Sequence, residues 1–280
     1  KYFIYLFNEL LSFYEPNGAS MTPEQTDIIL KTIPFLESRG GELTCHFYRR
    51  LFKNHPELRA YFNPAHQHDG SQQKALAGAI CAYAQHIENP SALAGAVELI
   101  AHKHASLGVK PEHYPVVGEH LLASIKELLG DDCTPDILDA WGEAYGVLAD
   151  IFVKREAKIY QEQSWTGFKP FTLEKKVDEG GPIVSFYLRP QDGQIQRHLP
   201  GQYLTVRVPH PETGTSMRNY SISMAAGGPV YRISVKKEAG ATEDAPGGYV
   251  SHYLHDTLQV GDTLEVGPPC GEFILDTSVP

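Results

Sequence analysis

The sequence contains few cysteines, and none of them lies in a pattern that usually binds a metal or attaches a haem. Cys45, Cys81, Cys133 and Cys270 are scattered along 280 residues, without a C-x-x-C or C-x-x-C-H motif. This spacing excludes an obvious zinc ribbon and a covalently attached c-type haem. The scattered positions are typical of cysteines that remain reduced. Because thiols stay reduced in the cytoplasm, we expect a cytoplasmic protein.

Long basic runs and long apolar runs are also missing. The formal net charge is −10 and Lys and Arg do not cluster, which argues against a nucleic-acid-binding groove. No stretch approaches the length of a membrane span, so we expect no stable membrane insertion. The sequence has no internal repeat and no low-complexity tract. Its length is sufficient for two domains that each have a hydrophobic core.

The first 20 residues differ in character from the rest of the chain. They are rich in aromatic residues, lack an initiating methionine, and have Asn8 and Glu9 within the apolar run. These features do not fit a signal peptide. We interpret residues 1–20 as upstream read-through or other non-native sequence, with the natural start at Met21. The alternative is an additional helix that packs on the first domain.

Residues 21–160 have a helical pattern and are predicted to form an all-α domain. Thr22 as N-cap, Pro23 at the first helical position and Gln25 form a capping box. Apolar periodicity and Gly/Pro/Asn breaks predict further helices over 41–53, 69–88, 91–107, 111–129 and 135–162.

Residues 169–280, after a linker at 161–168, have the pattern of an antiparallel β-barrel. Short alternating runs between turn clusters predict about six strands, with one short helix near Ser251–Asp256. The strands include Ile183–Leu188, Tyr203–Val208, Tyr220–Ser223, Tyr231–Val235 and Thr263–Val266.

Four of the predicted helices carry a polar residue within an apolar stripe. These residues are Gln72, His104, Tyr114 and Glu156, whereas His102 lies off the stripe of its helix. A buried carboxylate without a partner is costly, so we expect Glu156 to have a donor, with a histidine and a tyrosine as candidates. Each residue alone could be an ordinary hydrogen-bonded core residue. Together, in one all-α domain, they predict a haem pocket.

Several segments closely resemble the globin domain of bacterial flavohaemoglobins. They are Leu43–Tyr48, Asn54–Phe62, Ile100–His104, Gly118–Ala123, Asp139–Gly142, Tyr145–Ala149 and Arg155–Ala157. The resemblance extends from Met21 to the C-terminus. It implies a multidomain α and β protein, in which an all-α globin fold precedes an antiparallel β-barrel of the ferredoxin-reductase type.

This resemblance also implies roles for individual residues around haem b. His104 is the implied proximal iron ligand, supported by Tyr114 and Glu156. A carboxylate that accepts the second N–H of a ligand histidine makes the imidazole more electron-donating. Lys103 matches a position that adjusts the haem potential or faces the flavin domain; a solvated helix lysine is the alternative. The distal and porphyrin-packing residues are Tyr48, Gln72, Leu76 and Phe62.

The β region contains motifs suited to a flavin. Arg218 can neutralise a phosphate, Tyr220 can lie against an isoalloxazine face, and Ser221 can donate to a ring nitrogen. Backbone N–H groups after Gly248 can hold a pyrophosphate. The order of these motifs resembles the FAD barrel of ferredoxin-reductase-like flavoenzymes. The residues expected to bind FAD are Tyr203, Arg218, Asn219, Tyr220, Ser221, Gly248, Tyr249, Val250 and Ser251.

The resemblance implies a nitric oxide dioxygenase. A monomer would oxidise nitric oxide to nitrate with O₂, and its haem would be re-reduced through FAD by NAD(P)H. In that family an NAD(P)H domain follows, whereas this sequence ends at Pro280. We therefore expect either a fragment or a protein that uses a separate reductase. The alternative function is an oxygen-binding or oxygen-sensing globin module, for which we expect haem bands without flavin bands.

Overall fold

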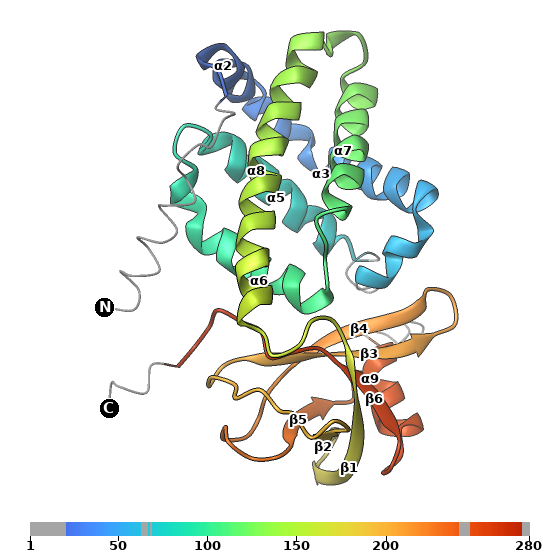
Figure 1. Cartoon of the computed structure of the whole chain (residues 1–280). Helices are drawn as coiled ribbons and strands as arrows, with labels where there is room; N and C mark the ends of the chain where they lie inside the picture. The colour runs from blue at the N-terminus through green and yellow to red at the C-terminus, as the bar shows by residue number, and fades with distance from the viewer. Residues whose placement is uncertain (1–20, 63–66, 68, 241–246, 276–280) are drawn as a thin grey trace. The chain divides into compact units, whose positions relative to one another are not determined.

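The computed structural model describes residues 21–62, 67, 69–240 and 247–275, which form two compact units (Figure 1). The first unit contains the described residues of Lys1–Arg59, His66–Ala101 and Lys110–Ala157. The second contains those of Ala60–Ala65, His102–Val109 and Lys158–Pro280. The prediction for residues 1–20 lies outside the described residues. The predicted domain boundaries remain predictions. They did not include the grouping of residues 102–109 with the second unit.

The helices follow the predicted order. They are α2 (Pro23–Lys31), α3 (Ile33–Asn54), α5 (Ser71–Gln85), α6 (Ala94–Leu107), α7 (His113–Leu129) and α8 (Pro135–Glu162), with short 3₁₀ turns η1 (Pro56–Tyr61), η2 (Pro90–Leu93) and η3 (Gly130–Asp132). The capping box at Thr22 and Gln25 is confirmed, because each side chain bonds the backbone of the other residue. Helix α3 begins earlier than predicted and includes Gly40, where an added Cβ would lie 3.4 Å from the Cβ of Ala77. A glycine inside this helix therefore permits close packing on α5.

Close packing between α7 and α8 orients a tyrosine of the first unit. A Cβ added at Gly118 would lie 2.5 Å from Cε1 of Tyr145, so glycine makes room for this ring. The Tyr145 hydroxyl donates to the backbone oxygen of Tyr114 over 2.6 Å. Burial raises the pKa of Tyr145 well above its ordinary value, which keeps the hydroxyl protonated as a donor. The backbone at Tyr114 is thereby fixed to α8.

The second unit is built on an antiparallel six-stranded sheet with the order β4-β3-β6-β1-β2-β5. The strands are β1 (Lys169–Gly180), β2 (Ile183–Pro190), β3 (Tyr203–His210), β4 (Gly214–Ser221), β5 (Tyr231–Lys236) and β6 (Thr263–Val266). The predicted fold class is confirmed. The sheet does not close into a barrel, however, because β4 and β5 lie at its two edges and do not pair along their length. In the described part of the chain, these edges are linked by an isolated bridge between Ile222 and Ile233.

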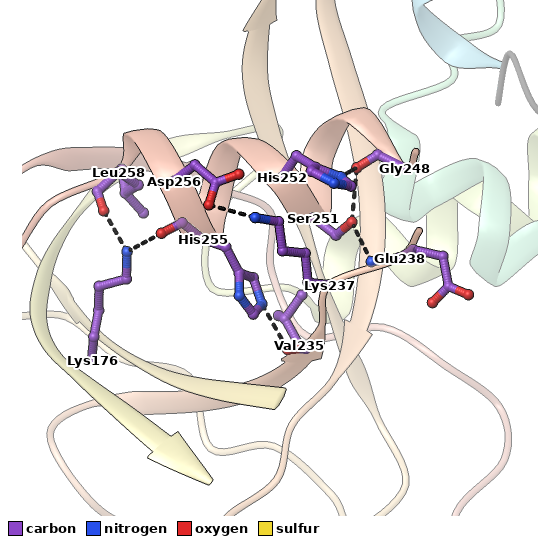
Figure 2. Close-up of polar contacts among 10 residues, drawn as sticks. All are labelled: Lys176, Val235, Lys237, Glu238, Gly248, Ser251, His252, His255, Asp256 and Leu258. Carbon is purple, nitrogen blue, oxygen red and sulfur yellow. Dashed lines mark hydrogen bonds and ion pairs between the residues drawn. The ribbon is translucent and has the colours of Figure 1, made fainter. Parts of the chain in front are cut away.

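A short helical segment packs on this sheet, as predicted near Ser251–Asp256. It consists of α9 (Tyr249–His252) and the π-helical turn η4 (Tyr253–Thr257). Figure 2 shows how its end is held: Nζ of Lys176 donates to the backbone oxygens of His255 and Leu258, over 2.9 and 2.7 Å. Lys237 forms a 2.6 Å ion pair with Asp256. These contacts fix the segment that begins after Gly248.

None of the helices in the described residues combines the length and apolar character required to cross a bilayer.

Candidate functional site

A buried hydrogen bond joins α7 to α8 in the first unit. The Tyr114 hydroxyl donates to Oε1 of Glu156 over 2.5 Å, and Glu156 is only 2% exposed. Tyr114 also stacks on Phe152, with ring centroids 6.4 Å apart. The tyrosine therefore supplies the donor that the sequence predicted for Glu156. A hydrogen bond of this kind holds the Glu156 side chain in one orientation and leaves it lone pairs for a second donor.

An ion pair beside Glu156 ties α8 to α6, and the sequence analysis did not identify it. Nε and Nη2 of Arg155 donate to the two carboxylate oxygens of Glu98, over 2.7 and 2.5 Å. The side chains are 8% and 16% exposed. Removing one partner of such a pair leaves an uncompensated buried charge. This pair therefore restrains the backbone on either side, including that of Glu156.

A second polar pair lies between α3 and α5. Tyr48 is 5% exposed, and its hydroxyl is hydrogen-bonded to the side chain of Gln72. Burial raises the pKa of Tyr48 to about 12, although the bond to Gln72 lowers it in part. Tyr48 is therefore a neutral hydroxyl at physiological pH. Leu76, one turn after Gln72 on α5, is partly buried.

Three histidines of α6 and α7 have different surroundings in the structure. His104 is partly buried on α6, within the second unit. His102 accepts the Gly271 N–H at Nδ1 over 3.2 Å. His120 is 3% exposed, and its ring nitrogens have no hydrogen-bond partner among the described residues. Burial lowers the pKa of His120, which favours the neutral ring. The assignment of His104 as a ligand stays a prediction.

Two further residues assigned to the haem belong to the second unit. Phe62 follows η1 and is partly buried. The pKa of Lys103 is lowered, first by desolvation of its ammonium group and second by the positive charge of Arg218. The electrostatic environment of Lys103 thus includes a residue of the flavin motif. The first unit contains the pairs Tyr48–Gln72 and Tyr114–Glu156.

The R-x-Y-S motif occupies the end of β4. Arg218 is partly buried, its Nη1 donates to the backbone oxygen of Met217 over 2.6 Å, and burial lowers its pKa. Burial also raises the pKa of Tyr220 to about 12, partly offset by the charge of Arg218. Ser221 is exposed at the last position of the strand. This strand end presents a cationic, an aromatic and a hydroxyl side chain in sequence.

The turn before α9 is tightly organised around Ser251, as Figure 2 shows. Oγ of Ser251 donates to the backbone oxygen of Gly248 over 2.8 Å and accepts the Glu238 N–H over 3.1 Å. A Cβ added at Gly247 would collide with the His252 ring, and one at Gly248 would lie 3.0 Å from Oγ of Ser251. Only glycine fits both positions without rearrangement, which brings bare backbone to the surface of this turn.

The remaining flavin-motif residues have distinct surroundings. Val250 is 1% exposed and belongs to the core of the sheet unit. The Tyr249 hydroxyl donates to the backbone oxygen of Pro209 over 2.9 Å. Tyr203 and Asn219 are partly buried on β3 and β4, and Nδ2 of Asn219 donates to Oγ of Ser106 over 3.3 Å. Ser106 was not among the residues predicted from the sequence.

Comparisons with known proteins match both units. Residues 45–152 match the family described as Globin, and residues 170–274 match the Oxidoreductase FAD-binding domain. The chain is 53% identical over 263 residues to a Flavohemoprotein of Rhodopirellula baltica, covering 91% of this chain and 64% of the relative. It is 49% identical over 264 residues to a Flavohemoprotein of Bordetella pertussis, covering 91% and 65%. The chain thus spans slightly less than two thirds of these relatives.

A solved structure has the same succession of folds. It is the crystal structure of flavohemoglobin from Malassezia yamatoensis with bound FAD and heme. The TM-score is 0.81 at 26% sequence identity, and the match covers 92% of this chain and 67% of that chain.

Proposed function

Since the chain belongs to the flavohaemoprotein family, whose globin and FAD-binding regions it carries, we propose that it functions in a nitric oxide dioxygenase. Its cofactors are haem b and FAD, in line with the groups bound in the Malassezia protein. Nitric oxide, O₂ and one electron combine to give one nitrate ion, so atoms and charge balance. In the whole protein, NAD(P)H supplies the electron through FAD to the haem.

The donor sets of this chain fit these two groups. Haem requires a neutral histidine and a mostly apolar pocket with a few directed polar groups, and α3, α5, α7 and α8 contribute two polar pairs, Tyr48–Gln72 and Tyr114–Glu156. A flavin nucleotide requires close backbone approach to its phosphates, which the glycines before α9 allow. When bound, the haem iron activates dioxygen and FAD passes single electrons.

The observation that carries the proposal is the buried Tyr114–Glu156 hydrogen bond. We assign His104 as the iron ligand, with Glu156 accepting its second ring N–H. Tyr114 then holds the Glu156 side chain in the orientation in which it can accept this N–H, which makes the imidazole a stronger electron donor. A reversible oxygen carrier does not need such a strongly donating histidine, whereas oxidation of nitric oxide benefits from it.

Tyr48 would supply a hydrogen-bond donor to the gaseous ligand in the haem pocket. Its raised pKa keeps the proton on the hydroxyl, and Gln72 restrains its orientation. Leu76 and Phe62 supply the apolar surface. Exclusion of water strengthens the interaction between the hydroxyl and a partly charged oxygen.

In the second unit, Arg218 would pair with a flavin phosphate, Tyr220 would lie against the ring system and Ser221 would donate to a ring nitrogen. The backbone N–H groups after Gly248 would hold the pyrophosphate. Lys103 is exposed, its ammonium group is influenced by the charge of Arg218, and we propose that it would face the flavin when FAD is bound.

Anaerobic photoreduction of the flavin tests this function in the chain as it stands. We expect the purified protein to show both haem and flavin absorption bands. After a light pulse, the flavin should reoxidise while the haem becomes reduced at the same rate. A protein with haem bands alone, or with two cofactors that exchange no electrons, would instead favour an oxygen-binding globin module.

A further inference from the structure

The last turn of α6 and the loop after it are anchored within the second unit at both ends. At one end, the Gly271 N–H donates to Nδ1 of His102 over 3.2 Å. At the other, the Tyr160 hydroxyl donates to the backbone oxygen of Val109 over 2.5 Å. Residues 102–109 accordingly belong to the same compact unit as the sheet. This segment contains His104.

A buried polar network joins the middle of this segment to two strands. Ser106 is 2% exposed, and its Oγ donates to the Lys103 backbone oxygen over 2.8 Å and accepts from Nδ2 of Asn219 over 3.3 Å. Oδ1 of the same amide accepts from the Thr205 hydroxyl over 3.0 Å. The Tyr203 hydroxyl lies near both side chains: burial raises its pKa, and the polar groups of Ser106 and Asn219 lower that pKa in part.

The composition of the network indicates more than packing. Thr205 is 0% exposed and lies between the buried apolar residues Leu204 and Val206 of β3. A buried polar network in such surroundings is stable only when its members are mutually satisfied, and it then specifies one arrangement. Both ends of the Asn219 amide are used, so its side chain is fixed in orientation.

We propose that Ser106 and Asn219 are positioning residues that couple the histidine-bearing end of α6 to the flavin-binding strand β4. This inference rests on the proposed function. Ser106 lies two positions after His104, and Asn219 lies between Arg218 and Tyr220. The hydrogen bond between these two side chains therefore connects the end of α6 that bears the proposed iron ligand to the strand that bears the flavin motif. Electron transfer between two cofactors depends steeply on their separation, and this link restrains that separation.

Variants at both positions test the proposal in the holoprotein. Ser106→Ala and Asn219→Ala are each expected to slow flavin-to-haem electron transfer after a light pulse by roughly fivefold, as for the loss of one hydrogen bond. The double variant should be no slower than the slower single variant, because both substitutions remove the same link. Haem content should not change, and the rates are compared on the FAD-loaded fraction of each variant, because Asn219 is also among the residues expected to bind FAD.

Ser124→Ala is the matched control. Its buried hydroxyl also donates to a carbonyl of its own helix, the backbone oxygen of His120, over 2.7 Å. This variant removes a comparable local bond on α7 and should leave the transfer rate unchanged. An equal slowing in Ser124→Ala, unchanged rates in the Ser106 and Asn219 variants, or additive effects in the double variant would overturn the proposal.

Hydrogen exchange provides a readout that does not depend on electron transfer. Ser106→Ala and Asn219→Ala should each increase amide exchange in residues 102–109, whereas Ser124→Ala should increase it in α7. If the unsubstituted chain transfers no electrons but the exchange pattern follows this expectation, the proposed function fails and the structural coupling stands. Unchanged exchange in residues 102–109 contradicts the coupling.

Discussion

Replacement of His104 by alanine is expected to abolish stoichiometric haem binding. A haem that is not covalently attached is retained largely through its axial ligand and its apolar pocket. The absence of C-x-x-C-H excludes covalent attachment to cysteines. The His104→Ala protein should therefore be purified with FAD but with little haem, as measured by the ratio of haem to flavin absorbance.

His102→Ala is the control for this experiment, because it removes a histidine of the same helix, one that bonds the Gly271 backbone. It should retain haem. Added imidazole should restore haem binding to His104→Ala by occupying the space left by the ring, which separates loss of the ligand from loss of the fold. A five-coordinate, histidine-ligated spectrum in His104→Ala without imidazole would show that another residue binds the iron.

The substitution Tyr48→Phe is expected to raise the O₂ dissociation rate by about tenfold or more. A hydrogen bond to a partly charged acceptor contributes about 1.5 kcal/mol or more, and phenylalanine preserves the ring while removing the donor. Flash photolysis and stopped-flow displacement by carbon monoxide measure this rate.

Tyr83→Phe is the matched control, since Tyr83 is likewise buried and its hydroxyl donates to the backbone oxygen of Ala144 over 2.8 Å. Its removal should lower stability slightly and leave O₂ dissociation unchanged. An unaltered dissociation rate in Tyr48→Phe would remove Tyr48 from the mechanism.

Local sequence signals predicted the features that depend on neighbouring residues. The capping box at Thr22 and the span of α8 follow from such signals, and the structure agrees with both. The donor for Glu156 could also be anticipated, because burial of a carboxylate requires one. In contrast, the start of α3 was predicted too late. Glycine disfavours helices in isolation, yet Gly40 lies inside α3, where an added Cβ would already be in van der Waals contact with Ala77 on α5.

Pairs that are distant in the sequence left no signal of this kind. Arg155 and Glu98 are 57 positions apart, and Asn219 and Ser106 are 113 apart. Nothing in the local pattern of either residue indicates its partner, because such contacts arise only when helices and strands pack. Likewise, alternation along strands predicted an antiparallel sheet, but not that β4 and β5 would remain its edges.

The most direct test of the central claim is a single-turnover reaction with nitric oxide. The chain is reduced, equilibrated with O₂ and mixed with nitric oxide in a stopped-flow instrument, and the products are then quantified. We expect about one nitrate per haem, formed faster than O₂ dissociates, with the haem left oxidised. Release of O₂ followed by simple nitric oxide binding, without nitrate, would contradict the assignment as a dioxygenase.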